Sequence, residues 1–307
     1  MVESQSLYLN YLAKTLLGIG SLTIAALGAL YLKQNSLIYH PAFPVKSPSL
    51  NPFGLRLPSD RGLLYKDIET VTSDGVKLKG WFIHQKNPID APTIIFMHEN
   101  AGNIGQRLQY FQYIYSNLDV NIVTLGYRGY SDSDGTPSEQ GIKLDAKAIV
   151  EHVLKMEEVD NDKLFLLGRS IGGAVAIYTA SQYPDTFRGL IIENSFTSMG
   201  DMVDSINKYL GLVKGLVLRN YWNSIDLVEN LKLPILFVHG NKDELVPCWM
   251  GEKLHDNSKN SVEKKKYIVE GGTHNDTWYV GQKEYLEELL GFINMAQCYK
   301  LPNYEAN

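Results

Sequence analysis

A serine, an aspartate and a histidine occur in this chain in the types and order that nucleophilic catalysis requires. Ser170 lies at the centre of the sequence Gly-Arg-Ser-Ile-Gly, which follows an apolar segment and precedes a run of small residues. In this strand-turn-helix context, G-x-S-x-G places its serine on a tight turn. A serine hydroxyl is a poor nucleophile at neutral pH, so it needs a base to accept its proton. The pentapeptide alone also fits a glycine-rich turn with a solvated serine.

Asp243 and His274 supply the other two groups. Asp243 follows the apolar segment 234–239, and His274 follows the apolar segment 266–269. Ligands of an open parallel sheet bind at the carboxyl ends of its strands, and the order Ser, Asp, His is typical of a nucleophile served by a base and an orienting acid. Taken singly, Asp243 fits a turn and His274 a surface loop. Together the three residues predict a catalytic triad, with His274 as base and Asp243 holding its imidazole.

Acyl transfer also needs backbone N–H groups that bind the developing oxyanion. The residue after the nucleophile, Ile171, is one candidate donor, and Asn100, in the loop after the apolar segment 93–97, is the other. Glu193 and Glu244 are backup acids, whereas His98 and His239, at or near strand ends, have the pattern of packed imidazoles. No metal-ligand spacing and no glycine-rich phosphate-binding motif occurs in the sequence, so we expect neither a metal nor a cofactor.

Short apolar segments alternate with amphipathic ones over most of the chain, which predicts an α/β fold with a mostly parallel, doubly wound sheet. Alternating residues on both sides of the turn Ser73-Asp-Gly predict an N-terminal antiparallel hairpin at 64–83. The expected strands are 93–97, 120–125, 164–167, 189–192, 234–239 and 266–269. The expected helices are 103–116, 138–156, 171–182, 249–257 and 280–295.

The N-terminus carries an uncharged, mostly apolar run at 15–32, between Lys14 and Lys33. Such a run is long enough to cross most of a bilayer as a helix. A cleaved signal peptide would have a basic start and a shorter core, so we expect an uncleaved single-pass anchor. We expect a tail at 1–14, a proline-rich extended connector at 33–61, the catalytic domain at 62–297 and a C-terminal tail at 298–307.

Composition excludes several functional classes. The 307 residues carry a net charge of −5 with mixed signs and no basic stripe, so nucleic acid is not an expected partner. Two cysteines are too few for a disulfide framework.

The acceptor sequence Asn275-Asp-Thr directly follows His274, and a glycan there would obstruct the site. This argument favours a catalytic domain on the cytosolic side of the membrane.

Several segments together resemble the α/β-hydrolase superfamily. They are His98-Glu-Asn-Ala-Gly-Asn, Gly126-Tyr-Arg-Gly-Tyr-Ser, Gly168-Arg-Ser-Ile-Gly-Gly-Ala, Ile191-Ile-Glu-Asn-Ser-Phe-Thr-Ser, His239-Gly-Asn-Lys-Asp and Gly272-Thr-His-Asn-Asp-Thr-Trp. Over nearly the whole chain they resemble its membrane-anchored group, which includes α/β-hydrolase-domain-containing protein 13 and the bud-emergence hydrolase. The resemblance implies a serine hydrolase with the triad Ser170, Asp243 and His274 behind a signal-anchor. It also implies type II orientation, which conflicts with the glycan argument, so the facing stays open.

One position departs from the group's pattern, which usually reads His-Gly-Asn where this chain has Glu99 between His98 and Asn100. A glutamate in a positive-φ conformation is strained, and its carboxylate could oppose an oxyanion. We therefore expect Glu99 either to point away from the site or to slow the reaction. Asn100 is the less secure of the two donors.

The segment 198–231 is expected to be a small lid. Apolar residues recur in it at helical spacing, which fits either ordinary core packing or a cover over an acyl pocket. Similarity to hydrolases that remove palmitate from cysteine thioesters implies an acyl ester or thioester substrate and a membrane as partner. Two alternatives stay open, a peptidase of the same fold and a catalytically silent scaffold. The sequence leaves the oligomeric state open.

Overall fold

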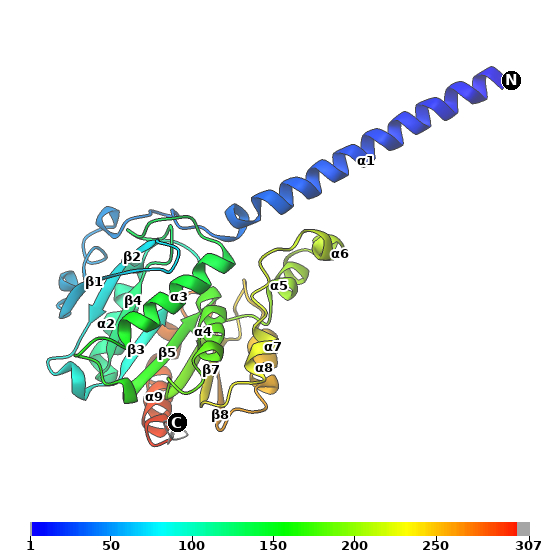
Figure 1. Cartoon of the computed structure of the whole chain (residues 1–307). Helices are drawn as coiled ribbons and strands as arrows, with labels where there is room; N and C mark the ends of the chain where they lie inside the picture. The colour runs from blue at the N-terminus through cyan, green and yellow to red at the C-terminus, as the bar shows by residue number, and fades with distance from the viewer. Residues whose placement is uncertain (1, 300–307) are drawn as a thin grey trace, which may run out of the picture.

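In the part of the chain that the structure describes, eight strands form one sheet in the order β1-β2-β4-β3-β5-β6-β7-β8. The computed structural model describes residues 2–299 of the chain (Figure 1). Strand β2 is antiparallel to both neighbours, β1 and β4, and every later pair is parallel. The strands are β1 (Tyr65–Val71), β2 (Lys77–Ile83), β3 (Thr93–Met97), β4 (Asn121–Leu125), β5 (Leu164–Arg169), β6 (Gly189–Glu193), β7 (Ile235–Gly240) and β8 (Lys264–Val269). The predicted hairpin and doubly wound parallel sheet are confirmed.

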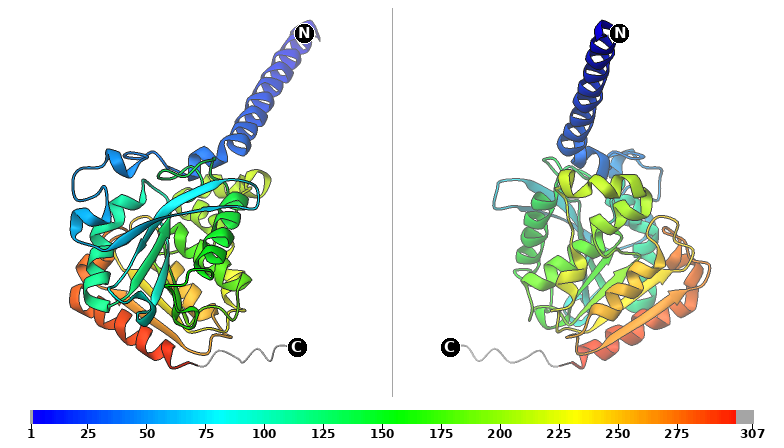
Figure 2. Two further views of the ribbon diagram at one scale, coloured as in Figure 1. Left: turned by 60° about the vertical axis from the view of Figure 1, so that its left-hand side comes forward. Right: turned by 90° about the vertical axis from the view of Figure 1, so that its right-hand side faces the viewer.

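Helices cover both faces of this sheet (Figures 1 and 2). Those of the domain are α2 (Leu108–Leu118), α3 (Glu139–Val153), α4 (Ile171–Gln182), α5 (Met199–Ile206), α6 (Lys208–Val217), α7 (Ser224–Val228), α8 (Cys248–Asn257) and α9 (Thr277–Gln297). Helices α3, α4, α7 and α8 share one apolar cluster with the sheet, and α2 and α9 share a second cluster on the opposite face. Each expected helix of the domain is present, with ends shifted by a few residues.

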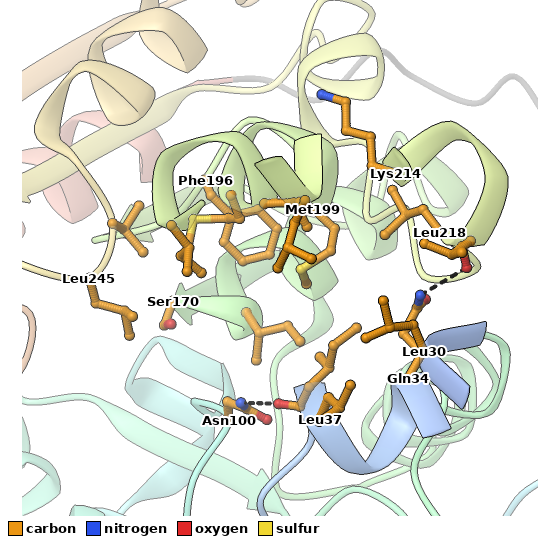
Figure 3. Close-up of a pocket in the computed structure, with 18 of the residues that line it drawn as sticks. Leu30, Gln34, Leu37, Asn100, Ser170, Phe196, Met199, Lys214, Leu218 and Leu245 are labelled. Carbon is orange, nitrogen blue, oxygen red and sulfur yellow. Dashed lines mark hydrogen bonds between the residues drawn. The ribbon is translucent and has the colours of Figure 1, made fainter. Parts of the chain in front are cut away.

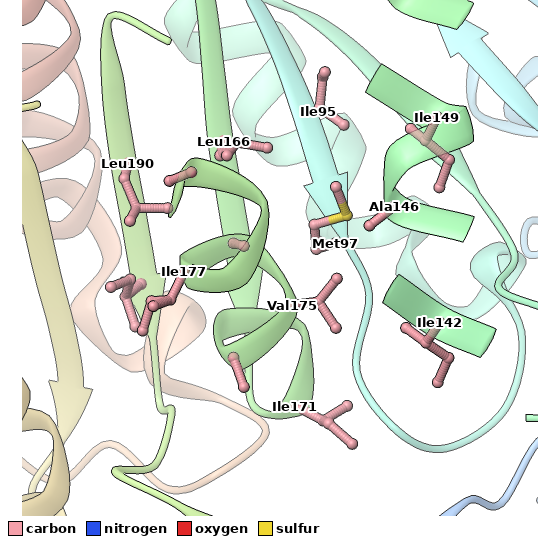
Figure 4. Close-up of a cluster of buried hydrophobic side chains, with 14 of the residues drawn as sticks. Ile95, Met97, Ile142, Ala146, Ile149, Leu166, Ile171, Val175, Ile177 and Leu190 are labelled. Atoms are coloured by element: carbon pink, nitrogen blue, oxygen red, sulfur yellow. The ribbon is translucent and has the colours of Figure 1, made fainter. Parts of the chain in front are cut away.

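The two clusters follow from the alternation of side chains along buried strands. In β3, Ile95 and Met97 point to the cluster of α3 and α4, where Val175 also lies (Figure 4). Ile94 and Phe96 point to the other cluster. All five residues of β3 are buried, because a strand between two helix layers needs an apolar side chain on each face.

The N-terminal helix is longer than predicted. Helix α1 (Val2–Ile38) projects away from the domain (Figures 1 and 2). Its span Ser6–Ile38 has 33 residues and is long and apolar enough to cross a membrane. The most apolar stretch of this span is not buried against the rest of the protein. The predicted boundaries of the tail at 1–14 and the anchor at 15–32 are therefore not element boundaries. No proline precedes Pro41, so nothing in the sequence ends the helix at Leu32.

The predicted connector at 33–61 is non-helical only after Ile38, and it is not uniformly extended. It contains two short 3₁₀ helices, η1 (Pro48–Leu50) and η2 (Pro58–Arg61), each with proline in its first turn. Proline's fixed φ suits the first turn of a helix, which explains why a proline-rich stretch forms these turns. Of the predicted tail at 298–307, residues 300–307 lie outside the described residues.

The segment 198–231 contains α5, α6 and α7. Helix α7 packs against α4, and its Val228 is fully buried, so it belongs to the core. Helices α5 and α6 differ: Met202 is buried, whereas Ile206, Tyr209 and Leu216 are exposed. Core packing therefore does not account for the apolar pattern of α5 and α6.

Candidate active site

Ser170 lies on a sharp turn between β5 and α4. Its backbone has φ 55° and ψ −125°, a conformation that costs a residue with a side chain about 1–3 kcal/mol. Two hydrogen bonds hold the turn: the Ser170 N–H donates to the Glu193 carbonyl at 2.9 Å, and the Ser195 hydroxyl donates to the Ser170 carbonyl at 2.8 Å. This geometry is the strained turn that the G-x-S-x-G pattern predicts.

The two glycines of that pattern allow the strand and helix to approach closely. A Cβ at Gly168 would lie 2.1 Å from the Gly172 carbonyl oxygen, and a Cβ at Gly172 would lie 2.0 Å from the Met97 carbonyl oxygen. Both contacts are with backbone atoms, which cannot rotate away as a side chain can. The backbone of β3, β5 and α4 thus meets at the turn with no room for another methyl group.

His274 and Asp243 continue from Ser170 in a chain of hydrogen bonds. The His274 Nε2 lies 3.1 Å from the Ser170 Oγ, and the His274 Nδ1 lies 2.8 Å from the Asp243 Oδ2. The other carboxylate oxygen, Oδ1, accepts the N–H groups of Leu245 and Val246 at 2.9 and 2.7 Å. These two bonds fix the carboxylate on the loop after β7, with its second oxygen toward the imidazole. The structure thus brings all three predicted residues together.

The charge of Asp243 determines the tautomer of His274. Burial alone would raise the pKa of Asp243, but hydrogen bonds from His239 and His274 outweigh it and hold the pKa well below its usual range. An ionised carboxylate can only accept, so the neutral imidazole carries its proton on Nδ1 and leaves Nε2 free to accept from Ser170. His239 lies at the end of β7, with its Nε2 3.5 Å from the Asp243 Oδ2.

The two predicted oxyanion donors lie beside the nucleophile. Ile171 and Asn100 line the same cavity as Ser170. Within the described part of the chain, neither backbone N–H has an acceptor. The Asn100 side chain is fixed at both ends, because its Nδ2 donates to the Ile38 carbonyl and its Oδ1 accepts from the Tyr130 hydroxyl at 2.8 Å.

Glu99 points away from the site, the first of the two outcomes expected from the sequence. Glu99 does not line the cavity of Ser170. Among the described residues, it is not one of those with positive φ, so its backbone does not have the strain that a positive φ would cause. Its carboxylate oxygens lie 2.7 Å from the Arg107 Nε and 3.1 Å from the Arg169 Nη1. Burial alone would raise the pKa of Glu99, but the two guanidinium groups lower it.

The two backup acids have other partners. Glu193 accepts from the Tyr285 hydroxyl at 2.7 Å and lies 3.4 Å from the Arg169 Nε. Glu244 accepts the backbone N–H of His274 at 3.3 Å, so it contacts the loop and not the imidazole. Neither residue replaces Asp243.

His98 is a packed imidazole, as its position after a strand indicates. Its ring stacks on Tyr127 with 3.8 Å between centroids, and its Nε2 accepts the Tyr127 N–H at 3.0 Å. Burial lowers the pKa of His98 to about 4, so the ring is neutral at physiological pH.

Ser170 opens into an apolar cavity of about 450 Å³. In Figure 3, Ser170 and Leu245 lie at one end of it and Leu30, Gln34 and Leu218 at the other. Helices α5 and α6 form one wall, and the end of α1 forms part of another. Nothing in the sequence pattern assigns Leu30 or Gln34 to the site, because their role depends on where α1 meets the domain.

No group of three His, Cys, Asp or Glu side chains suited to a metal ion occurs in residues 2–299. The expectation that the chain needs no metal or cofactor stays a prediction.

Sequence relatives place the fold in a known group. Residues 139–294, about half of the chain, match the family described as the prolyl oligopeptidase family. The α/β hydrolase domain-containing protein WAV2 of Arabidopsis thaliana is 34% identical over 92% of this chain and 95% of its own length. The protein bem46 of Schizosaccharomyces pombe is 37% identical over 84% and 85%. The membrane protein YNL320W of Saccharomyces cerevisiae is 35% identical over 85% and 89%.

A solved structure agrees on the fold. The esterase Pf2001 of Pyrococcus furiosus superposes with a TM-score of 0.64 over 78% of this chain and 94% of its own, at 20% identity. At this low sequence identity, the similarity supports the fold and does not assign a function. By the family match and the relatives, the chain belongs to the α/β-hydrolase superfamily, in the prolyl oligopeptidase family and in the group of WAV2 and bem46.

Proposed function

We propose that this α/β hydrolase is a membrane-anchored serine hydrolase that cleaves carboxylic esters or thioesters through an acyl-enzyme. The observation that carries the proposal is the hydrogen-bonded series Ser170, His274 and Asp243 at the end of an apolar cavity. Such a series activates a serine for attack on a carbonyl carbon. The helix α1 holds the enzyme in the membrane.

In the first half of the reaction, the Ser170 Oγ attacks the substrate carbonyl while His274 Nε2 takes the hydroxyl proton. The carbonyl oxygen becomes an oxyanion, which the N–H groups of Ile171 and Asn100 stabilise. Asp243 stabilises the imidazolium that forms. The bond to the leaving oxygen or sulfur then breaks, and His274 returns its proton to the leaving alcohol or thiol. The acyl group stays on Ser170.

In the second half, a water molecule replaces the leaving group. His274 accepts a proton from the water, whose oxygen attacks the acyl carbonyl and forms a second oxyanion in the same site. The bond to Ser170 breaks, the serine recovers its proton from His274, and a carboxylic acid leaves. The products are one acid and one alcohol or thiol.

The walls of the cavity favour an acyl substrate over a peptide. The residues that line it are mostly aliphatic, and among those of the described chain Lys214 is the one lysine or arginine. Burial of apolar chain contributes about 0.8 kcal/mol per methylene group, so such walls select alkyl chains. The name of the matched family keeps a peptidase as the alternative to be tested.

A substrate panel tests the proposal. We expect the full-length protein in detergent micelles to hydrolyse acyl esters and acyl thioesters, and Ser170→Ala to lose this activity. Cleavage of peptides without cleavage of esters or thioesters would favour the peptidase. Absence of turnover on the whole panel would favour the silent scaffold.

A further inference from the structure

One wall of the Ser170 cavity comes from the N-terminal helix and not from the hydrolase domain. Leu30, Gln34, Leu37 and Ile38 of α1 line the cavity together with Ser170. Helices α5 and α6, which we call the lid, lie on the opposite side, so the cavity runs between α1 and α6 (Figure 3). Without the end of α1, this side of the cavity would be open to solvent.

A buried amide fixes this wall to the lid. Gln34 is 8% exposed, and its Nε2 donates to the Val217 carbonyl at 3.0 Å. Its Oε1 accepts the N–H groups of Arg219 and Asn220, each at 2.8 Å, and the Asn220 Nδ2 at 3.0 Å. A buried amide with this many partners keeps a single orientation. The end of α1 and the chain that leaves α6 therefore form one unit.

The same helix end is also joined to the loop of the second oxyanion donor. The Asn100 side chain donates to the Ile38 carbonyl, which is one of the unpaired carbonyls at the end of α1. His40 forms an isolated β-bridge with Ala101, and the Gly102 N–H donates to the His40 carbonyl at 3.2 Å. The end of α1 thus contacts the lid on one side and the Asn100 loop on the other.

The residues of α1 that form this wall lie at the end of the uncharged run 15–32. The run ends at Lys33, and Leu30 and Leu37 lie on either side of it, about 10 Å apart along the helix axis at 1.5 Å per residue. Lysine near the end of an apolar helix lies at the membrane interface. The cavity therefore opens at the level of the bilayer surface.

The outer face of α6 is apolar as well. Tyr209, Leu212 and Leu216 are 82%, 82% and 73% exposed, and their spacing of three and four residues places them on one side of the helix. Helix α6 lies at the end of the domain from which α1 leaves (Figures 1 and 2). An exposed apolar face of α6 thus lies on a helix that contacts α1, at the end of the domain where α1 would enter the membrane.

We propose that the seam between α1 and α6 admits one acyl chain directly from the leaflet surface, so that the membrane anchor is itself part of the acyl-binding site. The carbonyl carbon lies at Ser170 and the chain runs past Leu37 toward Leu30. The substrate class is a membrane-resident ester or thioester of a long acyl chain. This inference rests on the proposed hydrolase function.

Filling the far end of the cavity tests this inference. Leu30→Trp places a bulky ring at that end, and Leu32→Trp is the matched control, because Leu32 is 72% exposed on the same helix and does not line the cavity. Both full-length variants are assayed in micelles with thioesters from acetyl to palmitoyl. We expect the ratio of kcat/KM on palmitoyl thioester to kcat/KM on acetyl thioester to fall about tenfold in Leu30→Trp, the equivalent of about two buried methylene groups, and to stay unchanged in Leu32→Trp.

The outcomes separate the two proposals. Labelling of Ser170 by a fluorophosphonate in both variants shows that the site is folded. Equal chain-length profiles for Leu30→Trp and Leu32→Trp, with an active wild-type protein, would overturn the acyl-site role of α1 and leave the hydrolase function standing. A wild-type protein with no activity on thioesters or esters of any chain length would overturn the proposed hydrolysis of acyl esters and thioesters, and with it the role given to α1.

Discussion

Arg169 and Glu99 form a buried ion pair, with 3.1 Å between Nη1 and Oε1, that joins the residue before the nucleophile to the residue before Asn100. The same guanidinium lies 3.4 Å from Glu193 at the end of β6 and donates to the His274 carbonyl at 3.1 Å. This side chain, which precedes the nucleophile, therefore contacts the oxyanion loop, the end of β6 and the histidine loop. Its partners fix the relative positions of these three segments.

Removal of Glu99 should destabilise the protein, even when the replacement is the glycine usual in the resembling group. Glu99→Gly leaves the buried guanidinium group of Arg107 without an anion, and it leaves Arg169 with Glu193 as its remaining anion. Breaking a buried ion pair on one side costs about 3–5 kcal/mol, which we expect as the loss in free energy of unfolding. Chemical denaturation of the full chain in micelles measures it.

The double variant Glu99→Gly with Arg107→Gln is the control. Removing one of the two cations should recover part of the loss, as a double-mutant cycle would show. An unchanged or raised stability of Glu99→Gly alone would contradict the role given to this ion pair.

The hydrogen bond from Tyr130 to Asn100 should affect turnover more than binding. Tyr130→Phe frees one end of the Asn100 side chain and loosens the loop whose N–H binds the oxyanion. We expect kcat to fall roughly tenfold with little change in KM. This loss is smaller than the loss in kcat that follows complete removal of one oxyanion donor. Steady-state kinetics on a soluble acyl ester measures both constants.

Tyr127→Phe is the matched control for Tyr130→Phe. The Tyr127 hydroxyl is buried and has no hydrogen-bond partner in the described residues. Its removal should leave both kinetic constants unchanged and the stability unchanged or slightly raised. Equal losses of kcat in the two variants would show that the hydroxyl of Tyr130 acts through packing in this region and not through its hydrogen bond to Asn100.

Gly172→Ala should prevent the turn at Ser170 from forming. The added Cβ would lie 2.0 Å from a backbone carbonyl oxygen of β3, so the strand or the helix would have to move. We expect a loss of labelling at Ser170 together with a lower unfolding temperature. Gly291→Ala on α9 is the control, since no atom of the described residues lies within 4 Å of the position that the added Cβ would take. Alanine there should stabilise the helix by about 0.5–1 kcal/mol.

His98 should make the folded protein less stable in acid. Burial lowers the pKa of His98 to about 4, so between pH 6.5 and 4 the unfolded chain binds a proton that the folded chain does not. Stability is therefore lost as the pH falls through this window. Asp145, whose pKa burial raises to about 6, acts in the opposite direction, so the test compares two variants.

The comparison is between wild-type protein and His98→Gln, which lacks this titration and keeps Asp145. From pH 7 to pH 4.5, the advantage of the wild-type protein in free energy of unfolding should shrink by up to about 3 kcal/mol. A difference that stays constant over this range would contradict the neutral, buried state of His98.

The sequence predicts well whatever depends on local pattern. The turn at Ser170 follows from two glycines and a serine, and strand ends predict where Asp243 and His274 meet it, because a parallel sheet brings all its carboxyl ends to one edge. The end of α1 at Ile38 is also readable in retrospect from the position of Pro41. These features need only neighbouring residues or the order of strands.

Other features depend on how distant segments meet. The orientation of Glu99 is set by Arg107 and Arg169, whose positions come from a helix and a strand end that no local pattern relates. The contribution of Leu30 and Gln34 to the cavity depends on the angle at which α1 joins the domain. That angle is fixed by hydrogen bonds across nearly two hundred residues, as between Gln34 and Asn220.

Reaction with a fluorophosphonate, followed by intact-mass and peptide mass spectrometry, tests the central claim most directly. The claim is that His274 and Asp243 make Ser170 a nucleophile. It predicts a single adduct on Ser170 in the wild-type protein, none in Ser170→Ala, and labelling at least about a thousandfold slower in Asp243→Asn. An unlabelled wild-type protein, or undiminished labelling of Ser170→Ala, would contradict it.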